Sequence, residues 1–207
     1  GSRGLGDVYK RQIKDGRHSV VEKTIFKKSL NAFVPNDCSL STNEHLWLIT
    51  GPNMAGKSTF LRQNAHIIIL AQIGSYVPAK QAKIGIASKL FSRIGASDNI
   101  SKGQSTFMVE MLETSNIIKN ADDKSFIILD EIGRGTSTFD GLAIAWAIIE
   151  KVLRSNKSRT LFATHYHELT EIEKTNSKVR NVSCEIKEWN DEIIYSYKVV
   201  KGKSKGS

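Results

Sequence analysis

A short glycine-rich run constrains the fold more than any other feature of the sequence. Its eight residues are Gly51-Pro-Asn-Met-Ala-Gly-Lys-Ser58, which follow the pattern Gly-x-x-x-x-Gly-Lys-Ser/Thr. The apolar segment Leu46–Thr50 comes directly before the run, and in Ser58–Ile73 apolar residues recur at intervals of three and four. A buried strand, a tight turn and a helix are therefore predicted in that order, as in a phosphate-binding P-loop.

The residue types in this run suit a bound nucleotide. Glycines let the backbone turn so that its N–H groups point at phosphate oxygens, and the following helix presents its positive end to the anion. We expect Lys57 to place its ammonium on the β- and γ-phosphates and Ser58 to offer its hydroxyl to Mg²⁺. ATP or ADP, with Mg²⁺, are the predicted cofactors.

An acidic pair ends a second apolar segment. Phe126–Asp130 reads Phe-Ile-Ile-Leu-Asp and is followed by Glu131. We predict that Asp130 holds Mg²⁺, directly or through water, and that Glu131 polarises the attacking water. The alternative is a solvated acidic pair at a strand end, and the P-loop upstream favours the catalytic interpretation.

Further apolar segments alternate with amphipathic ones, which is typical of an α/β domain with a largely parallel sheet flanked by helices. The helix over Leu142–Leu153 is apolar almost all round and is predicted to be buried. Alternation from Val182 to Val200 predicts an antiparallel hairpin at the sheet edge. The remaining predicted elements are strands at Lys89–Ile94 and Arg159–Thr164 and a helix at Ser105–Asn120.

Two segments allow more than one interpretation. His165 follows a predicted strand, at the end of the sheet where ligands of α/β folds bind, so we predict contact with the γ-phosphate. A surface histidine pair, or a metal site with His167 and Glu168, are the alternatives. Ser105 stands at a predicted helix start, where it either contacts an anion or simply caps the helix.

Composition narrows the class of protein without deciding it. The chain of 207 residues has no apolar run of 18 residues, so a membrane span is not expected. Its net charge of +9 fits nucleic-acid contact or ordinary solvation, because the lysines are spread along the chain. Cys38 and Cys184 are predicted to be reduced structural thiols. Residues 1–12 lack a signal peptide and continue no pattern, so we expect an extraneous or unstructured segment there.

Together, the motifs resemble the ATPase domain of the MutS family of DNA mismatch repair proteins. The matching segments are 15–18, 51–59, 73–79, 105–110, 130–138 and 164–168. The resemblance implies an ABC-type P-loop ATPase domain over 13–200. It also implies that 201–207 is a basic tail at which the chain is truncated, before a helical dimerisation element. One departure is Ser19, where the family usually has proline.

The resemblance also implies roles for individual residues. Phe33 matches the residue that stacks on adenine, and Val34 adds backbone contacts. Lys57, Glu131 and His165 match catalytic or switch residues, and Asp130 matches the metal-associated acid, which acts with Ser58. Ser105 matches the residue that enters the partner subunit's ATP site. The nucleotide contacts of the loop fall on Gly51, Pro52, Asn53, Met54, Ala55, Gly56, Lys57, Ser58 and Thr59.

The function implied is hydrolysis of ATP to ADP and phosphate, coupled in the intact protein to mismatch recognition on DNA. The expected partners are a second subunit of the same kind, DNA bound through regions mostly absent from this chain, and a MutL-type repair protein. A bacterial-type cytoplasmic location, nucleoid-associated on DNA, is expected. Two alternatives stay open: a nucleotide-binding dimerisation module that is catalytically weak or silent in this truncated form, or another ABC-type ATPase of chromosome or repair machinery. The missing Leu-Ser-Gly-Gly-Gln signature speaks against the latter.

Overall fold

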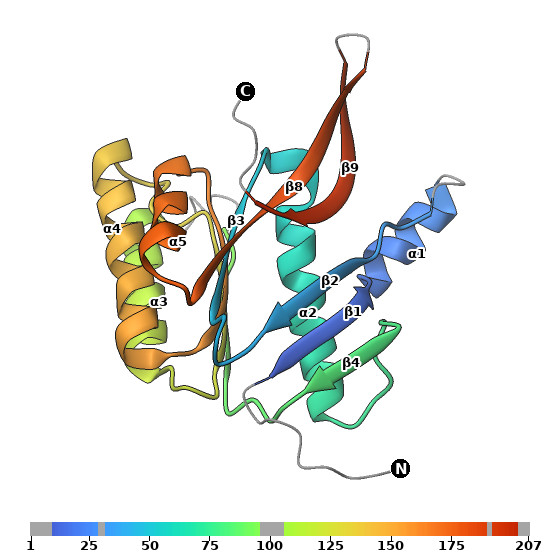
Figure 1. The fold of residues 1–207 in the computed structure, drawn as a ribbon, viewed down its shortest axis with the longest axis horizontal. Coiled ribbons are helices and arrows are strands. Elements are labelled where there is room, and N and C mark those ends of the chain that lie inside the picture. Colours follow the sequence, from blue (N-terminus) through green and yellow to red (C-terminus); the bar gives the residue numbers. More distant parts are fainter. Residues whose placement is uncertain (1–9, 29–31, 96–105, 190–191, 203–207) are drawn as a thin grey trace.

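The computed structural model describes residues 10–28, 32–95, 106–189 and 192–202. In these parts of the chain the strands form two sheets (Figure 1). The larger sheet has the order β5-β6-β7-β3-β8-β9, with strands β3 (Leu46–Thr50), β5 (Leu90–Arg93), β6 (Phe126–Asp130), β7 (Arg159–Ala163), β8 (Val179–Trp189) and β9 (Glu192–Lys201). Its neighbours from β5 to β8 pair in parallel, and β9 pairs antiparallel with β8 at the edge. The predicted α/β fold, with a largely parallel sheet and an antiparallel edge hairpin, is confirmed.

The central strands of this sheet are buried on both faces. In β3, Trp47 and Ile49 pack on one face while Leu46 and Leu48 pack on the other. Strands that are apolar on both faces need helices on both sides, and the structure supplies them. Helix α2 (Lys57–Gln72) covers one face, and α3 (Thr106–Asn120) and α4 (Thr138–Lys151) cover the other (Figure 1).

Helix α4 differs from its prediction in position and in burial. It begins four residues earlier than predicted, because Ser137 caps it by accepting a hydrogen bond from the Asp140 backbone N–H at 3.2 Å. It passes at Val152 into a short π-helical turn. The prediction of a buried helix is wrong for its outer side, where Phe139 is 86% and Trp146 36% exposed, because only one side of α4 meets the sheet.

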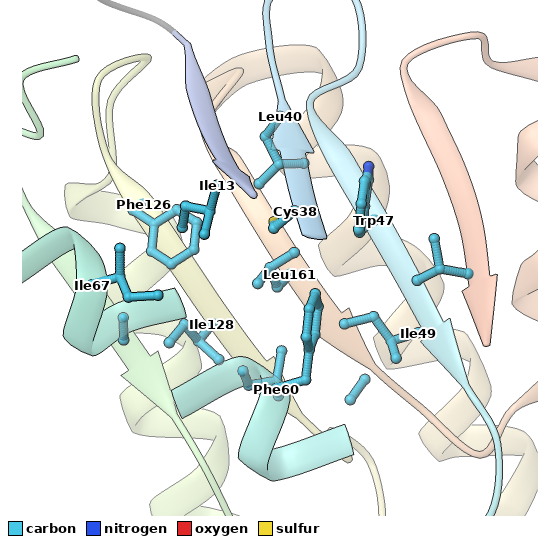
Figure 2. Packing of buried hydrophobic residues seen from close by; sticks show 14 of the residues in the cluster. Ile13, Cys38, Leu40, Trp47, Ile49, Phe60, Ile67, Phe126, Ile128 and Leu161 are labelled. Carbon is cyan, nitrogen blue, oxygen red and sulfur yellow. The ribbon is translucent and has the colours of Figure 1, made fainter. Parts of the chain in front are cut away.

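The smaller sheet was not predicted from the sequence. Its order is β2-β1-β4, formed by β1 (Arg11–Gly16), β2 (Asn36–Leu40) and β4 (Gln81–Ile84), and both pairings are antiparallel. Helix α1 (Ser19–Lys28) follows β1. Ile13, Cys38 and Leu40 of this sheet pack in the same apolar cluster as residues of α2 and the large sheet (Figure 2). Helix α2 therefore lies between the two sheets and ties them together (Figure 1).

The first strand begins two residues before the predicted start of the domain. Arg11 is 1% exposed, and its guanidinium donates to the carbonyl oxygens of Ile86 and Lys124 at 3.0 and 3.3 Å. Arg11 and Gln12 therefore belong to the folded chain, and residues 1–9 of the predicted leading segment lie outside the described residues. At the other end β9 runs to Lys201, and residues 203–207 also lie outside them.

Two further findings bear on composition. Cys38 and Cys184 are buried and free, as expected for structural thiols. Among the helices in the described parts of the chain, none is long and apolar enough to cross a membrane.

Candidate functional site

The glycine-rich run connects β3 to α2 as predicted. Gly51 and Gly56 have φ values of 124° and 95°, which a side chain would strain, and between them lies a single turn of 3-10 helix over Asn53–Ala55. A Cβ on Gly51 would also lie only 3.3 Å from the carbonyl oxygen of Cys184 on β8. The loop conformation thus depends on both glycines, and α2 begins at Lys57, directly after the second of them.

Lys57 is buried inside the loop. Its side chain is 2% exposed, and its ammonium donates to the Gly51 carbonyl oxygen and lies 4.0 Å from Oε1 of Glu131. Burial lowers the pKa of Lys57 below its ordinary value, while the Glu131 carboxylate acts in the opposite direction. The structure therefore holds a cationic group between the phosphate loop and the acidic pair.

The end of β6 brings Asp130 against the loop. Its Oδ2 accepts a hydrogen bond from the Ser58 hydroxyl at 2.6 Å, and its Oδ1 is buried without a hydrogen-bond partner among the described residues. Burial raises the pKa of Asp130. The unsatisfied carboxylate oxygen of Asp130 and the Ser58 hydroxyl oxygen lie next to each other. Both are hard oxygen ligands, which suit a divalent cation such as Mg²⁺.

Glu131 lies one residue beyond the strand in an unusual backbone conformation. Its φ is 52°, and its N–H donates to the Ala163 carbonyl oxygen at 2.9 Å, which anchors it to the end of β7. Its Oε2 accepts a hydrogen bond from Nη1 of Arg134 at 2.7 Å. The carboxylate is thus directed to the mouth of the loop, between Lys57 and Arg134. Sequence reasoning did not single out Arg134, since an arginine in a polar loop carries no distinctive pattern.

His165 follows β7 at the same edge of the sheet. Its ring lies 4.1 Å from that of Tyr166, centroid to centroid. Its side chain is exposed, yet partial desolvation lowers the pKa of His165; Glu131 acts in the opposite direction, and Arg134 and Lys57 lower this pKa further. The structure thus brings His165 to the sheet end that the sequence predicted. In the described part of the chain, no group of three or more His, Cys, Asp or Glu side chains is arranged to hold a metal.

A cavity of about 720 Å³ opens beside the loop. Its wall includes six predicted nucleotide-binding residues, namely Phe33, Val34, Met54, Gly56, Ser58 and Thr59. Gly51, Pro52, Ala55 and Lys57 are not among the residues that line it. Ala55 is fully buried, and its N–H already donates to the Pro52 carbonyl oxygen at 3.1 Å. The structure therefore joins the segment around Phe33 to the phosphate loop, which are about twenty residues apart in the sequence.

Three residues of β9 line the same cavity and were missed by sequence reasoning. They are Tyr195, Ser196 and Tyr197. A register shift in the β8–β9 hairpin falls between Cys184 and Ile186, and Tyr197 has a φ of 55°. This bulge brings the tyrosine within 3.3 Å of the position that a Cβ on Gly56 would occupy. The aromatic residues alternate along β9, but nothing in that alternation indicates that the strand passes over the loop.

Asn36 fastens β9 to the segment that carries Phe33. Its amide nitrogen donates to the Tyr197 carbonyl oxygen at 2.9 Å and to that of Val34 at 3.3 Å. Its amide oxygen accepts from the Val199 N–H at 2.8 Å. One buried side chain thus holds two walls of the cavity together. Ser105, the remaining predicted site residue, lies outside the described residues, and α3 begins at the next position.

Comparison with known proteins places these features in a family. Residues 47–207 match the family described as MutS domain V. Similar proteins named "DNA mismatch repair protein MutS" occur in Thermodesulfovibrio yellowstonii (57% identical over 194 residues), a Ruegeria species (56% over 192) and Ehrlichia chaffeensis (54% over 203). The alignments cover 92%, 92% and 98% of this chain but 23%, 22% and 24% of the relatives, so the chain spans less than a quarter of their length.

Proposed function

The chain belongs to the MutS domain V family, and from this premise and the geometry of the site we propose that it binds ATP with Mg²⁺ and hydrolyses it to ADP and phosphate. The observation that carries the proposal is the meeting of three groups at one phosphate loop. They are the buried Lys57 ammonium, the Ser58–Asp130 pair with its unsatisfied oxygen, and the Glu131 carboxylate.

The phosphate end of the nucleotide belongs at the loop. Backbone N–H groups of the loop and of the first turn of α2 present partial positive charge to the β- and γ-phosphates, and Lys57 adds a full charge. Ser58 and Asp130 would hold Mg²⁺, which when bound neutralises charge on these phosphates. The unsatisfied Oδ1 of Asp130 supports this, because a buried carboxylate oxygen without a partner is costly unless a ligand completes it.

The base end belongs in the adjoining cavity. Phe33 offers an aromatic face and Val34 a backbone edge on one wall, while Tyr197 stands on another. Aromatic rings suit a purine base because offset stacking adds to the burial of apolar surface. The volume of about 720 Å³ is within the range of small-molecule and cofactor sites.

The placement of Glu131 beside Lys57 supports hydrolysis. A water oxygen attacks the γ-phosphorus, the bond from that phosphorus to the β,γ-bridging oxygen breaks, and ADP leaves with that oxygen. Glu131 orients the water and accepts its proton, and Lys57 stabilises the charge that shifts toward the leaving group. His165 follows β7 at the same end of the sheet, where it would respond to the γ-phosphate.

A complete site requires a second subunit. We propose that Ser105 enters the ATP site of a partner subunit, so that two chains each complete the other's site. In the intact protein, nucleotide turnover would drive mismatch recognition and repair on DNA, with a MutL-type protein as a further partner, in the cytoplasm. The names of the relatives support this role, and the regions that contact DNA would lie mostly outside this chain.

A second candidate function is a nucleotide-binding module without turnover. Its supporting observation is that the Glu131 carboxylate is engaged by Arg134 at 2.7 Å and faces Lys57 at 4.0 Å in the single chain. A carboxylate held in this way is less available to a water molecule. Binding without hydrolysis would then be the property of the isolated chain.

Phosphate release measured over a series of protein concentrations separates these functions. For a composite ATPase, activity per mole of protein rises with concentration as paired sites form. Glu131→Ala keeps ATP affinity within about twofold but lowers turnover by roughly 100-fold or more, because the general base is lost. A flat background rate equal to that of Glu131→Ala would leave only the binding module.

A further inference from the structure

In the loop that follows Glu131, both backbone polar groups of Gly133 are hydrogen-bonded to side chains. Oε1 of Glu110, on α3, accepts a hydrogen bond from the Gly133 N–H at 2.7 Å. The Tyr166 hydroxyl donates to the Gly133 carbonyl oxygen at 3.0 Å. Both contacts are buried, and Gly133 lies only two residues beyond Glu131.

The carboxylate of Glu110 is itself fixed. It is 6% exposed, and its Oε2 pairs with Nη2 of Arg93, at the end of β5, at 3.4 Å. Arg93 also pairs with Glu113, one turn further along α3, at 2.9 Å. Breaking a buried ion pair is costly, so the pair with Arg93 holds the Glu110 carboxylate in place. The carboxylate in turn fixes the position of the Gly133 N–H.

The surroundings of Gly133 leave little room for another arrangement. A Cβ added to Gly141 would lie 2.1 Å from the Tyr166 hydroxyl oxygen and 2.4 Å from the Gly133 carbonyl oxygen. A Cβ on Gly135 would meet Phe107, in the first turn of α3, at 3.1 Å. Helix α3 therefore touches the loop at two points, through Glu110 and through Phe107.

We propose that Glu110 and Tyr166 are positioning residues for Glu131, and that α3 sets the position of this carboxylate through the Gly133 peptide. The inference rests on the proposed function, in which Glu131 is the general base. Because Glu110 and Phe107 of α3 contact the loop that follows Glu131, a displacement of α3 would be transmitted to the acid of its own site. Helix α3 begins directly after Ser105. A partner bound at the start of α3 would thereby regulate hydrolysis.

Three substitutions and a control test the proposal in the 207-residue chain. Tyr166→Phe removes only the hydroxyl, and Glu110→Ala removes the acceptor of the Gly133 N–H. Glu110→Gln keeps an acceptor oxygen and serves as the conservative rescue. Glu113→Gln is the control, because it removes the more exposed of the two carboxylates that pair with Arg93 and does not touch the loop. Thermal unfolding confirms that each variant is folded.

Amide hydrogen exchange is the readout that does not depend on turnover. Loss of one buried hydrogen bond is expected to speed exchange at residues 132–134 roughly fivefold in Tyr166→Phe and Glu110→Ala. Glu110→Gln falls between these variants and the wild type, and Glu113→Gln matches the wild type. Unchanged exchange in both Tyr166→Phe and Glu110→Ala overturns the proposal.

Single-turnover hydrolysis with protein in excess is the second readout. Tyr166→Phe and Glu110→Ala should lower the rate constant roughly tenfold while the Kd for ATP stays within about twofold, because only the placement of the acid changes. In the Glu131→Ala background the same substitutions should have no further effect. A loss of equal size in that background, or a change confined to Kd, overturns the positioning role.

The same measurements distinguish this inference from the proposed function. If the wild type shows no hydrolysis that depends on Glu131, the proposed function fails and no positioning role for a general base remains. If wild-type hydrolysis depends on Glu131 but Tyr166→Phe and Glu110→Ala hydrolyse ATP at the wild-type rate, only the positioning role fails.

Discussion

At the scale of single residues, Lys57 illustrates how burial and function combine. Its ammonium is nearly inaccessible, and burial lowers its pKa, yet it donates to Gly51 and faces Glu131. A buried cation of this kind is costly for folding, and binding of an anion beside it stabilises the charge. We therefore interpret Lys57 as a group whose full set of partners includes the phosphates of a nucleotide.

Lys57→Ala tests this interpretation. Because charge-assisted hydrogen bonds to phosphate are lost, the Kd for ATP should rise roughly 10- to 100-fold. Titration with a fluorescent ATP analogue measures the change. Lys151→Ala, an exposed lysine at the end of α4, should bind like the wild type. An unchanged Kd in Lys57→Ala would mean that the phosphate site lies elsewhere.

Buried histidines make the stability depend on pH. Burial lowers the pKa of His18 and of His45 below the ordinary 6.5, and for His18 the neighbouring His66 and Arg62 act in the same direction. Below pH 6.5 these two histidines therefore bind more protons in the unfolded chain than in the folded chain, so their contribution to the free energy of unfolding falls as the pH is lowered.

Urea unfolding on either side of this value measures the effect. The chain should be less stable at about pH 5.5 than at about pH 7.5, and His18→Gln should reduce the difference. His167→Gln, at an exposed position, should leave the difference as it is. A difference of the same size in His18→Gln would show that other groups cause it.

At the scale of elements, the contact between α4 and the loop after β6 depends on two glycines. Gly141 in the first turn of α4 lies against Gly133, which has a φ of 90°. Helix propensity alone would favour alanine at position 141 by about 1 kcal/mol. The close approach reverses this, because a Cβ there would lie 2.1 Å from the Tyr166 hydroxyl oxygen.

Gly141→Ala is therefore expected to destabilise the protein. The overpacking should cost about 1–3 kcal/mol in the free energy of unfolding, more than the propensity gain. Ala143→Gly, on the exposed side of the same helix, should cost about 1 kcal/mol through propensity alone. Urea unfolding of both variants compares the two effects, and a Gly141→Ala protein more stable than the wild type would contradict the packing described here.

At the scale of the whole molecule, one wall of the cavity beside the phosphate loop comes from the β8–β9 hairpin and another from the segment after α1. Asn36 joins them through hydrogen bonds to Tyr197 and Val199, 161 and 163 residues away. The cavity is thus a product of the complete chain rather than of the phosphate loop alone. Its shape depends on hydrogen bonds between β2 and β9, which form only when both sheets are folded.

Asn36→Ala is expected to loosen this connection. The Kd for ATP should rise roughly 5- to 10-fold, because the loss of hydrogen bonds lets β9 move away from the base. Binding measured at a temperature well below the unfolding transition separates this effect from lost stability. Asn43→Ala, at an exposed position before β3, is the matched control. Equal affinity in the two variants would rule out a role for the hairpin in binding.

The sequence by itself determined the parts of the site that are local. An apolar run encodes β3, two glycines encode the turn at Gly51–Ser58, and a 3.6-residue repeat encodes the helix that follows. A second apolar run, which ends on Asp130, encodes β6. These patterns depend on neighbours in the chain, so they can be read without knowing the fold. The largely parallel sheet followed from their alternation.

Only the tertiary structure decided the contacts between distant segments. These contacts join residues whose local patterns carry no signal: the small sheet, the bulge at Tyr197, the salt bridge from Arg134 to Glu131, and the hydrogen bonds of Gly133 with Glu110 and Tyr166. The strands involved are short. In the sequence, the polar side chains cannot be distinguished from ordinary exposed residues, because their partners lie far away along the chain. Burial and register decide these contacts, and both are properties of the whole packed chain.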